Sequence, residues 1–354
     1  MHAIVHIGMP KAGSTSIQGA IWRNSDALLE QGIRTFRAST GPQDRALSTR
    51  FRPDQKKLVP IMRRWFRTMD EAQDWSQRCW EELEQMVRTE RPPLTLLSSE
   101  HFFNLPWPGK FLEALRELFS EITVVAYIRD PADFYKSEID QKIRGGVRLH
   151  DLDTPLSYVY PSATQARKYL RLLGRENMIV RNFDRKNLSG GDVVTDFFEV
   201  VGRIAGRPIS VPRMPPRANE SLCAAATVWL LTQNELFQRF TQGNDSETLK
   251  LRFDMIDRLR KAESLADLPR LGLTDPLFAD LIRYNAREAC TWYNETFFAD
   301  QVPFATGTKP SPLPDDEEIR SRMREWLFGY LTPEALDQVL REVVPLAAEE
   351  LEKV

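Results

Sequence analysis

The segment HIGMPKAGSTS, from His6 to Ser16, gathers glycines, a lysine and three hydroxyl side chains. Gly8 and Gly13 have the spacing of the two P-loop glycines, but the lysine is Lys11, and Ser14 stands where triphosphatase loops carry lysine. A turn that opens a helix offers backbone N–H groups and the positive end of the helix dipole, which favour an anion. The pattern predicts a phosphate-binding turn and argues against an ordinary ATPase or GTPase. The expected phosphate ligands are Lys11, Ala12, Gly13, Ser14, Thr15 and Ser16.

A second candidate group begins with Arg129, directly after a run of β-branched and aromatic residues. Its guanidinium is a planar, permanently charged fork that suits a phosphate. Pro131 favours the start of a helix, and Ser137 lies two turns further on, where its hydroxyl can donate to the same anion. Two other interpretations stay open. Arg129 and Asp130 could form a surface ion pair, or Asp130 could end a Walker B strand that holds Mg²⁺. The missing lysine after Gly13 weakens the second.

A candidate base follows another apolar run, in the sequence Ser99-Glu100-His101. Ligands of open α/β sheets bind at the carboxyl ends of the strands, so these side chains are expected at the ligand. A carboxylate or an imidazole there could take a proton from an attacking hydroxyl or amine. We expect Glu100 to be the base, with His101 as the alternative. The structural interpretation is that Glu100 caps a turn and His101 packs against Phe102.

Elements that could position these residues alternate through the first half of the chain. The expected strands are residues 3–7, 33–36, 94–98, 122–128 and 178–180, with helices between them. This alternation predicts an α/β fold with a P-loop-type parallel sheet flanked by helices. The later part has only helical periodicity, and the expected helices are residues 222–240, 249–262, 275–298 and 315–351.

The domain organisation follows from the same pattern. Residues 1–205 form the expected α/β core, and a helix within it, with apolar residues from Val193 to Val201, is expected to end at Gly202. Residues 38–90 are polar and rich in Arg, Gln and Trp, which indicates an insertion of loops and helices. Residues 206–354 begin with a proline-rich stretch and are expected to form a helical C-terminal region packed on the core.

Bulk composition excludes several classes of protein. The formal net charge of −2 gives no reason to expect nucleic acid as a partner. The three cysteines lie far apart and no CxxC occurs, so neither a disulfide framework nor a zinc site is expected, and no metal is predicted. No apolar run approaches the ~20 residues of a membrane span, and a cytoplasmic protein is expected. The oligomeric state is left open.

The first motif resembles the 5′-phosphosulfate-binding loop of sulfotransferases, whose pattern is Pro-Lys-x-Gly-[Ser/Thr]-Thr. Lys11, Gly13, Ser14 and Thr15 match it position by position. The resemblance implies 3′-phosphoadenosine 5′-phosphosulfate (PAPS) as the sulfuryl donor. Lys11 would then neutralise the charge that grows on the leaving phosphate oxygen, an interaction that strengthens in the transition state.

The second and third motifs extend the resemblance over roughly residues 1–205. Sulfotransferases bind the 3′-phosphate of the donor with an arginine and a serine eight residues later, which Arg129 and Ser137 match. The Ser-Ser-Glu sequence ending at Glu100 resembles bacterial and glycan-type members, which use glutamate as base, whereas the cytosolic type uses histidine. The resemblance implies sulfuryl transfer to an acceptor hydroxyl on a small molecule or a glycan. The acceptor, and the choice between O- and N-sulfation, stay open.

Two other classes of function compete with this interpretation. A P-loop kinase acting on a small molecule would require Mg-ATP. A non-catalytic nucleotide-binding protein would bind the donor without turnover.

Overall fold

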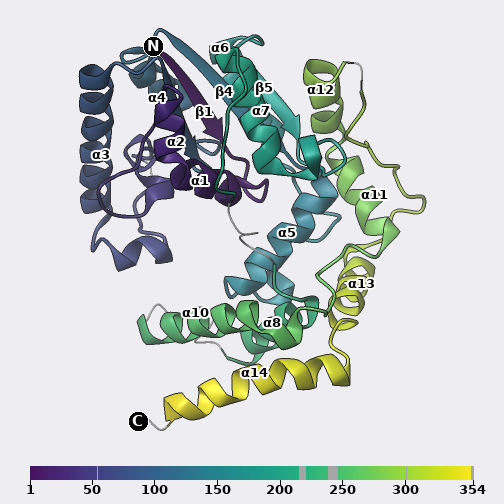
Figure 1. Cartoon of the computed structure of the whole chain (residues 1–354). Helices are drawn as coiled ribbons and strands as arrows, with labels where there is room; N and C mark the ends of the chain where they lie inside the picture. The colour runs from purple at the N-terminus through teal and green to yellow at the C-terminus, as the bar shows by residue number, and fades with distance from the viewer. Residues whose placement is uncertain (54, 215–220, 238–245, 300, 352–354) are drawn as a thin grey trace. The chain divides into compact units, whose positions relative to one another are not determined.

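The computed structural model describes residues 1–53, 55–214, 221–237, 246–299 and 301–351 (Figure 1). The chain forms two compact units, and each is built from several stretches of sequence. The first contains Met1–Asp130, Pro161–Ala218 and Glu295–Pro303, and the second contains Pro131–Tyr160, Asn219–Asn294 and Phe304–Val354. The division predicted at residue 205 stays a prediction.

The first unit is built on a parallel sheet whose strand order is β2-β3-β1-β4-β5. The strands are β1 (His2–Ile7), β2 (Ile33–Thr35), β3 (Leu94–Ser99), β4 (Glu121–Ile128) and β5 (Met178–Asn182). Each pair of neighbouring strands is parallel. In β1 and β4 every residue after the first is buried, as expected for strands with both faces covered. The predicted parallel α/β sheet flanked by helices is confirmed.

Helices of the first unit pack around this sheet in pairs. They are α1 (Ser14–Arg23), α2 (Ser25–Glu30), α4 (Pro108–Arg116), α6 (Ser162–Leu173) and α7 (Val193–Ala205). Helix α1 packs against α7, and α4 packs against α6. A 3₁₀ turn, η5 (Ser189–Gly191), precedes α7.

The predicted insertion of residues 38–90 consists of three 3₁₀ turns followed by one long helix. The turns are η1 (Gln43–Arg45), η2 (Thr49–Phe51) and η3 (Pro60–Arg64), and the helix is α3 (Met69–Glu90). Thr68 caps α3, because its hydroxyl accepts a hydrogen bond from the backbone N–H of Glu71. Turn η1 contacts β3, so the insertion reaches the carboxyl edge of the sheet.

Helix α7 does not end where the sequence predicted. It runs past Gly202 to Ala205, and Gly206 follows in the left-handed conformation that commonly ends helices. Gly202 has a packing role instead. A Cβ atom there would lie 2.9 Å from the carbonyl oxygen of Arg207, so only glycine lets the returning chain approach the helix.

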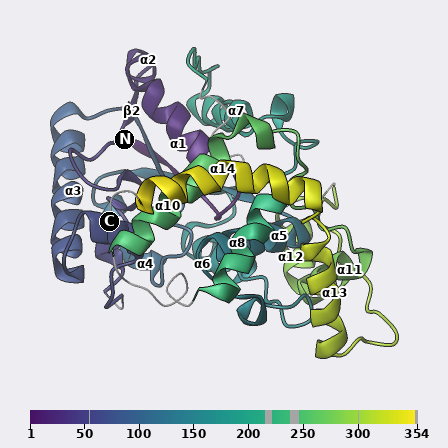
Figure 2. The same cartoon turned by 90° about the horizontal axis from the view of Figure 1, so that it is seen from below.

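The second unit is helical apart from its connections. Its elements include α5 (Pro131–Arg144), η4 (Leu149–Asp151), α8 (Ala224–Leu236), α10 (Ser246–Lys261), η6 (Glu263–Leu265), α11 (Pro276–Asn285), α13 (Asp316–Phe328) and α14 (Pro333–Leu351). Helix α8 contacts α5, α13 and α14. Helix α14 also runs beside α10 (Figure 2).

The helical character predicted for the later part of the chain is confirmed, but two long helices are divided. The stretch 275–298 contains α11 and α12 (Arg287–Phe297), which meet at Ala286. The stretch 315–351 contains α13 and α14, separated at Gly329 and the residues before Pro333. The end of the predicted helix 222–240, beyond residue 237, lies outside the described residues.

Candidate active site

The candidate residues of the first unit meet at the carboxyl edge of the sheet. In register, the last residue of β1, Ile7, pairs with Ser99 at the end of β3, and Ile128 at the end of β4 pairs with Asn182. Since all strands are parallel, the segments that follow them emerge at this same edge. The structure therefore brings together three of the sequence motifs: the loop after β1, the turn after β3 and Arg129 after β4.

The loop between β1 and α1 is tied to its neighbour and is locally strained. The backbone N–H of Gly8 donates to the carbonyl of Ser99 at 3.2 Å. A Cβ atom on Gly8 would lie 2.0 Å from the Ser14 hydroxyl oxygen, so the loop closes too tightly for any side chain there. Lys11 has φ 63°, in the left-handed region that non-glycine residues rarely adopt. Such strain persists only where the surroundings impose it, and it concentrates at functional sites.

Gly13 ends the loop and stands at the N-cap of α1. Its φ of 82° is left-handed, and a Cβ atom would lie 2.9 Å from the ring of Phe183 and from Val193. Helix α1 has no side-chain cap, and its first turn contains no acidic residue. The amide groups that open a helix have no partners within it, so this end of α1 can accept an anion.

Ser14 supplies the most informative polar atom of the loop. The residue is 4% exposed, and its hydroxyl oxygen has no hydrogen-bond partner within the part of the chain that the structure describes. Buried polar groups are nearly always hydrogen-bonded, so an unpaired hydroxyl at a helix start points to a ligand. Of its neighbours in the motif, Thr15 is exposed, Ser16 is half-buried and Ala12 is buried.

Arg129 connects the second motif to the first. Its Nη1 atom donates to the carbonyl oxygen of Lys11 at 3.0 Å, and its guanidinium lies 5.6 Å from the centre of the Phe183 ring. The same ring packs against Gly13. Arg129, which follows β4, and Phe183, which follows β5, therefore both contact the strained loop. The sequence predicted only a scaffold role for the stretch 181–184, and the contact of Phe183 with the loop depends on the close approach that Gly13 allows.

Ser137 lies in the second compact unit, on α5. It is half-buried, and its hydroxyl donates to the carbonyl of Asp133 at 3.0 Å. Arg129 belongs to the first unit, so the predicted pairing of Arg129 with Ser137 at one phosphate stays a prediction.

The turn after β3 carries Glu100 and His101 and adds a residue that the sequence analysis missed. A carboxylate oxygen of Asp44, in η1, lies 3.0 Å from Nε2 of His101. The same Nε2 atom lies 3.8 Å from a carboxylate oxygen of Glu100. Asp44 and His101 are 57 positions apart in the chain, so no local spacing could have joined them.

These three side chains form a cluster that has the donor types of a metal site. One ligand atom from each of Asp44, Glu100 and His101 lies within 4.8 Å of the others. The spacing of these residues in the sequence predicts no such grouping. One positive charge already lies beside the cluster, however, because Nε of Arg45 is 3.9 Å from the Asp44 carboxylate. A metal would have to bind against that fixed positive charge.

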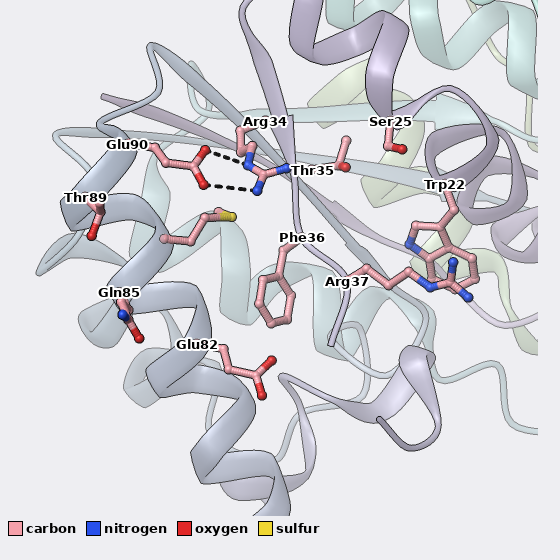
Figure 3. Close-up of a pocket in the computed structure, with 11 residues that line it drawn as sticks. Trp22, Ser25, Arg34, Thr35, Phe36, Arg37, Glu82, Gln85, Thr89 and Glu90 are labelled. Atoms are coloured by element: carbon pink, nitrogen blue, oxygen red, sulfur yellow. Dashed lines mark hydrogen bonds and ion pairs between the residues drawn. The ribbon is translucent and has the colours of Figure 1, made fainter. Parts of the chain in front are cut away.

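A separate pocket of about 530 Å³ lies away from these loops, between the edge strand β2 and helix α3 (Figure 3). Arg34 and Glu90 line this pocket and form a bidentate ion pair. The guanidinium of Arg37 lies over the ring of Trp22, 5.7 Å from its centre. The sequence analysis assigned no role to these residues.

Comparison with known proteins gives a limited result. No family model matches the sequence, and no curated protein sequence matches it. The chain is similar to the crystal structure of a sulfotransferase from Alicyclobacillus acidocaldarius, with 15% identity and a TM-score of 0.36, covering 70% of this chain and 98% of that one. It is also similar to the sulfotransferase domain from the curacin biosynthetic pathway, with 13% identity and a TM-score of 0.33, covering 59% of this chain and 75% of that one.

Both TM-scores are below 0.5, so any functional conclusion depends on the residues of this chain. Among the described residues, no helix is long and apolar enough to cross a membrane.

Proposed function

We propose that this chain is a sulfotransferase that moves a sulfuryl group from PAPS to an acceptor hydroxyl. In this reaction the acceptor oxygen forms a bond to sulfur while the bond from sulfur to the bridging oxygen of the 5′-phosphate breaks. The electron pair of the broken bond stays on that phosphate oxygen, and the products are a sulfate ester and 3′-phosphoadenosine 5′-phosphate (PAP). The acceptor proton passes to a base on the protein.

Each candidate residue has a role in this scheme. The loop from Lys11 to Ser16 holds the 5′-phosphosulfate, and Lys11 neutralises the charge that develops on the leaving oxygen. Glu100 takes the acceptor proton. Arg129 and Ser137 bind the 3′-phosphate, where a guanidinium and a hydroxyl offer donors to several oxygens.

The observation that carries the proposal is the direct approach of the Glu100 turn to the phosphate loop. A Cβ atom on Gly8 would lie only 3.3 Å from the Cα atom of Glu100. A side chain that can accept a proton is thus next to a strained loop with a buried, unpaired hydroxyl on Ser14. Transfer between a bound phosphosulfate and an acceptor requires these two features side by side.

The donor can be tested without knowing the acceptor. Thermal unfolding is followed with PAP in the presence of EDTA and, in parallel, with ATP and Mg²⁺. We expect PAP at 100 times its Kd to stabilise the chain by about 2.7 kcal/mol without metal. Stabilisation by Mg-ATP alone would instead support the kinase, because that chemistry needs the metal.

Catalysis is tested with a panel of mono- and oligosaccharides, alcohols and phenols, with PAP release and product mass as readouts. We expect Glu100→Gln to abolish transfer while PAP still binds, because the amide cannot take the proton. Binding of PAP by the wild type with no turnover on any acceptor would favour the non-catalytic alternative. Full transfer by Glu100→Gln would remove Glu100 from the mechanism.

A further inference from the structure

The inserted segment 38–90 is fastened to the end of β3 by Asp44, which lies in the 3₁₀ turn η1. The hydroxyl of Ser99 donates to the backbone carbonyl of Asp44, and the backbone N–H of His101 donates to the same hydroxyl oxygen at 3.0 Å. The side chain of Asp44 closes the ring by its 3.0 Å hydrogen bond to Nε2 of His101. Asp44 therefore holds the Glu100 turn through both its backbone and its carboxylate.

A second residue of the insertion, Arg52, binds the other end of the same turn. Arg52 donates from Nη2 to the backbone carbonyl of Asn104 at 2.8 Å and to that of His101 at 3.4 Å. The turn that carries Glu100 is thus bounded by contacts from η1 and from the chain after η2. These contacts give the insertion a structural reason to lie at the candidate site.

The charges around Asp44 keep its carboxylate ionised. Burial alone would raise its pKa, but the hydrogen bond and charge of His101 and the charge of Arg45 outweigh burial, so the pKa is lowered. The Asp44 side chain is 39% exposed and that of His101 only 17%. An ionised carboxylate is the stronger acceptor for an imidazole N–H, so the pair is well matched.

We propose that Asp44 is a positioning residue: it binds Nε2 of His101 and fixes the turn, leaving the Glu100 carboxylate as the group that receives the acceptor proton. This inference rests on the proposed function and deepens it, since it decides between the two candidate bases. The Glu100 side chain is 37% exposed, more than twice the value for His101. It has the greater access to an incoming hydroxyl, whereas the imidazole is already engaged.

The kinetic test compares Asp44→Ala with Asp44→Asn. We expect the alanine variant to lose 10-fold or more in kcat, of the order found for a misplaced catalytic group, with an unchanged KM for PAPS. The asparagine variant should keep kcat within about 3-fold, because its carbonyl oxygen still accepts from the imidazole N–H. Asp74→Ala removes an exposed acidic side chain from the same insertion and should leave kcat unchanged.

The alternative is an Asp44–His101 pair in which the imidazole itself is the base. It predicts that His101→Gln abolishes transfer and that Glu100→Gln retains it, and this outcome would overturn the inference. Our expectation is the reverse: Glu100→Gln abolishes transfer, and His101→Gln loses about as much as Asp44→Ala. Loss of PAP affinity in Asp44→Ala, with kcat preserved, would also overturn it.

An NMR measurement can test whether Asp44 positions His101 independently of the proposed function. The chain has four histidines, so the imidazole signals of isotope-labelled histidine can be assigned by replacing them singly. We expect a protected, downfield Nε2–H signal from His101 in the wild type, which persists in Asp44→Asn and disappears in Asp44→Ala. If the signal is the same in all three proteins, Asp44 does not position His101, whether or not the chain transfers sulfuryl groups.

Discussion

Two regions of the first unit could hold a ligand, and they differ in whether their polar groups already have hydrogen-bond or ion-pair partners. In the pocket between β2 and α3, several charged groups already have partners: the Arg34 guanidinium binds Glu90 through two nitrogens, and the Glu82 carboxylate accepts from the hydroxyl of Ser39. In the loop between β1 and α1, Lys11 is strained and the Ser14 hydroxyl is buried without a partner within the described ranges.

The volume of a cavity does not by itself identify a site of chemistry. The pocket has a volume of about 530 Å³, within the usual range for small-molecule sites, yet a ligand there would have to compete with the Arg34–Glu90 ion pair. An anion at the loop would satisfy the Ser14 hydroxyl, because a buried unpaired donor costs about 1–3 kcal/mol until it has a partner. Substitutions in the loop can test this difference between the two regions, and each is compared with a control substitution outside the loop.

The largest effect is expected from removing the positive charge of Lys11, with removal of a cation from the pocket as the control. Lys11→Ala should lower kcat roughly 100-fold to 1,000-fold, the usual loss when a donor to developing charge is removed. Arg37→Ala removes an exposed cation from the pocket and should leave transfer within about 2-fold of the wild type. Steady-state kinetics with one acceptor measures both. If Arg37→Ala is inactive and Lys11→Ala active, the pocket is the site of the reaction.

The next effect is on stability, at the glycine that ends the loop. In Gly13→Ala the new side chain has an unfavourable left-handed backbone and clashes with Phe183 and Val193. We therefore expect the free energy of unfolding to fall by about 2–3 kcal/mol. Gly206→Ala has a similar φ of 69° but no atom within 4 Å of the new Cβ, so it should lose about 1 kcal/mol. Urea unfolding gives both values. Equal losses would mean that close packing does not hold the loop.

A smaller effect is expected at Ser14, with opposite signs for folding and binding. Ser14→Ala should leave the free energy of unfolding unchanged or raise it slightly, because a buried hydroxyl without a partner is removed. It should weaken PAP binding about 10-fold, the equivalent of one hydrogen bond to a charged group. Ser76→Ala is the control, because its buried hydroxyl donates to the carbonyl of Ala46 at 2.6 Å. That variant should be destabilised and bind PAP normally, as calorimetry can show.

The sequence predicted those parts of the site whose residues are contiguous. Arg129 directly follows β4, and Lys11 to Ser14 lie in the loop after β1. Strand ends in a parallel sheet meet at one edge, so pattern and topology were enough to place these residues together. The contact of Arg129 with the Lys11 carbonyl was not predicted, because it depends on the side-chain geometry of a folded loop. Glu100 was proposed as the base from its place after β3, and this assignment stays a prediction.

Features that depend on distant residues were missed. Asp44 reaches His101 only through the fold of the insertion, and the short 3₁₀ turn that carries Asp44 has no helical or strand periodicity to read. The divisions of the helical stretches at Ala286 and Gly329 were also missed. At Ala286 no glycine or proline marks the break, whereas Gly329 and Pro333 are helix-end and helix-start signals that the apolar spacing obscured. Gly202 was predicted to end a helix, but the absence of a side chain there instead allows the backbone of Arg207 to approach closely.

The smallest expected effect concerns His6, in the strand that leads into the loop. It is fully buried, its Nδ1 bonds the hydroxyl of Ser98, and burial lowers its pKa to about 3. The unfolded chain binds this proton near pH 6.5, so stability is fully present above that pH and is lost as pH falls toward 3. Between pH 7 and pH 6 we expect a loss of about 0.7 kcal/mol from this residue.

The pH dependence can be isolated with two histidine variants. His6→Asn has no group that titrates in this window, so its free energy of unfolding should fall less between pH 7 and pH 6 than that of the wild type, whatever its absolute value. His150→Gln removes a histidine whose side chain is 65% exposed and should reproduce the wild-type slope. Urea unfolding at several pH values measures the slopes. If His6→Asn and the wild type lose stability in parallel, His6 becomes protonated inside the folded strand, and β1 is not the closed support that the loop requires.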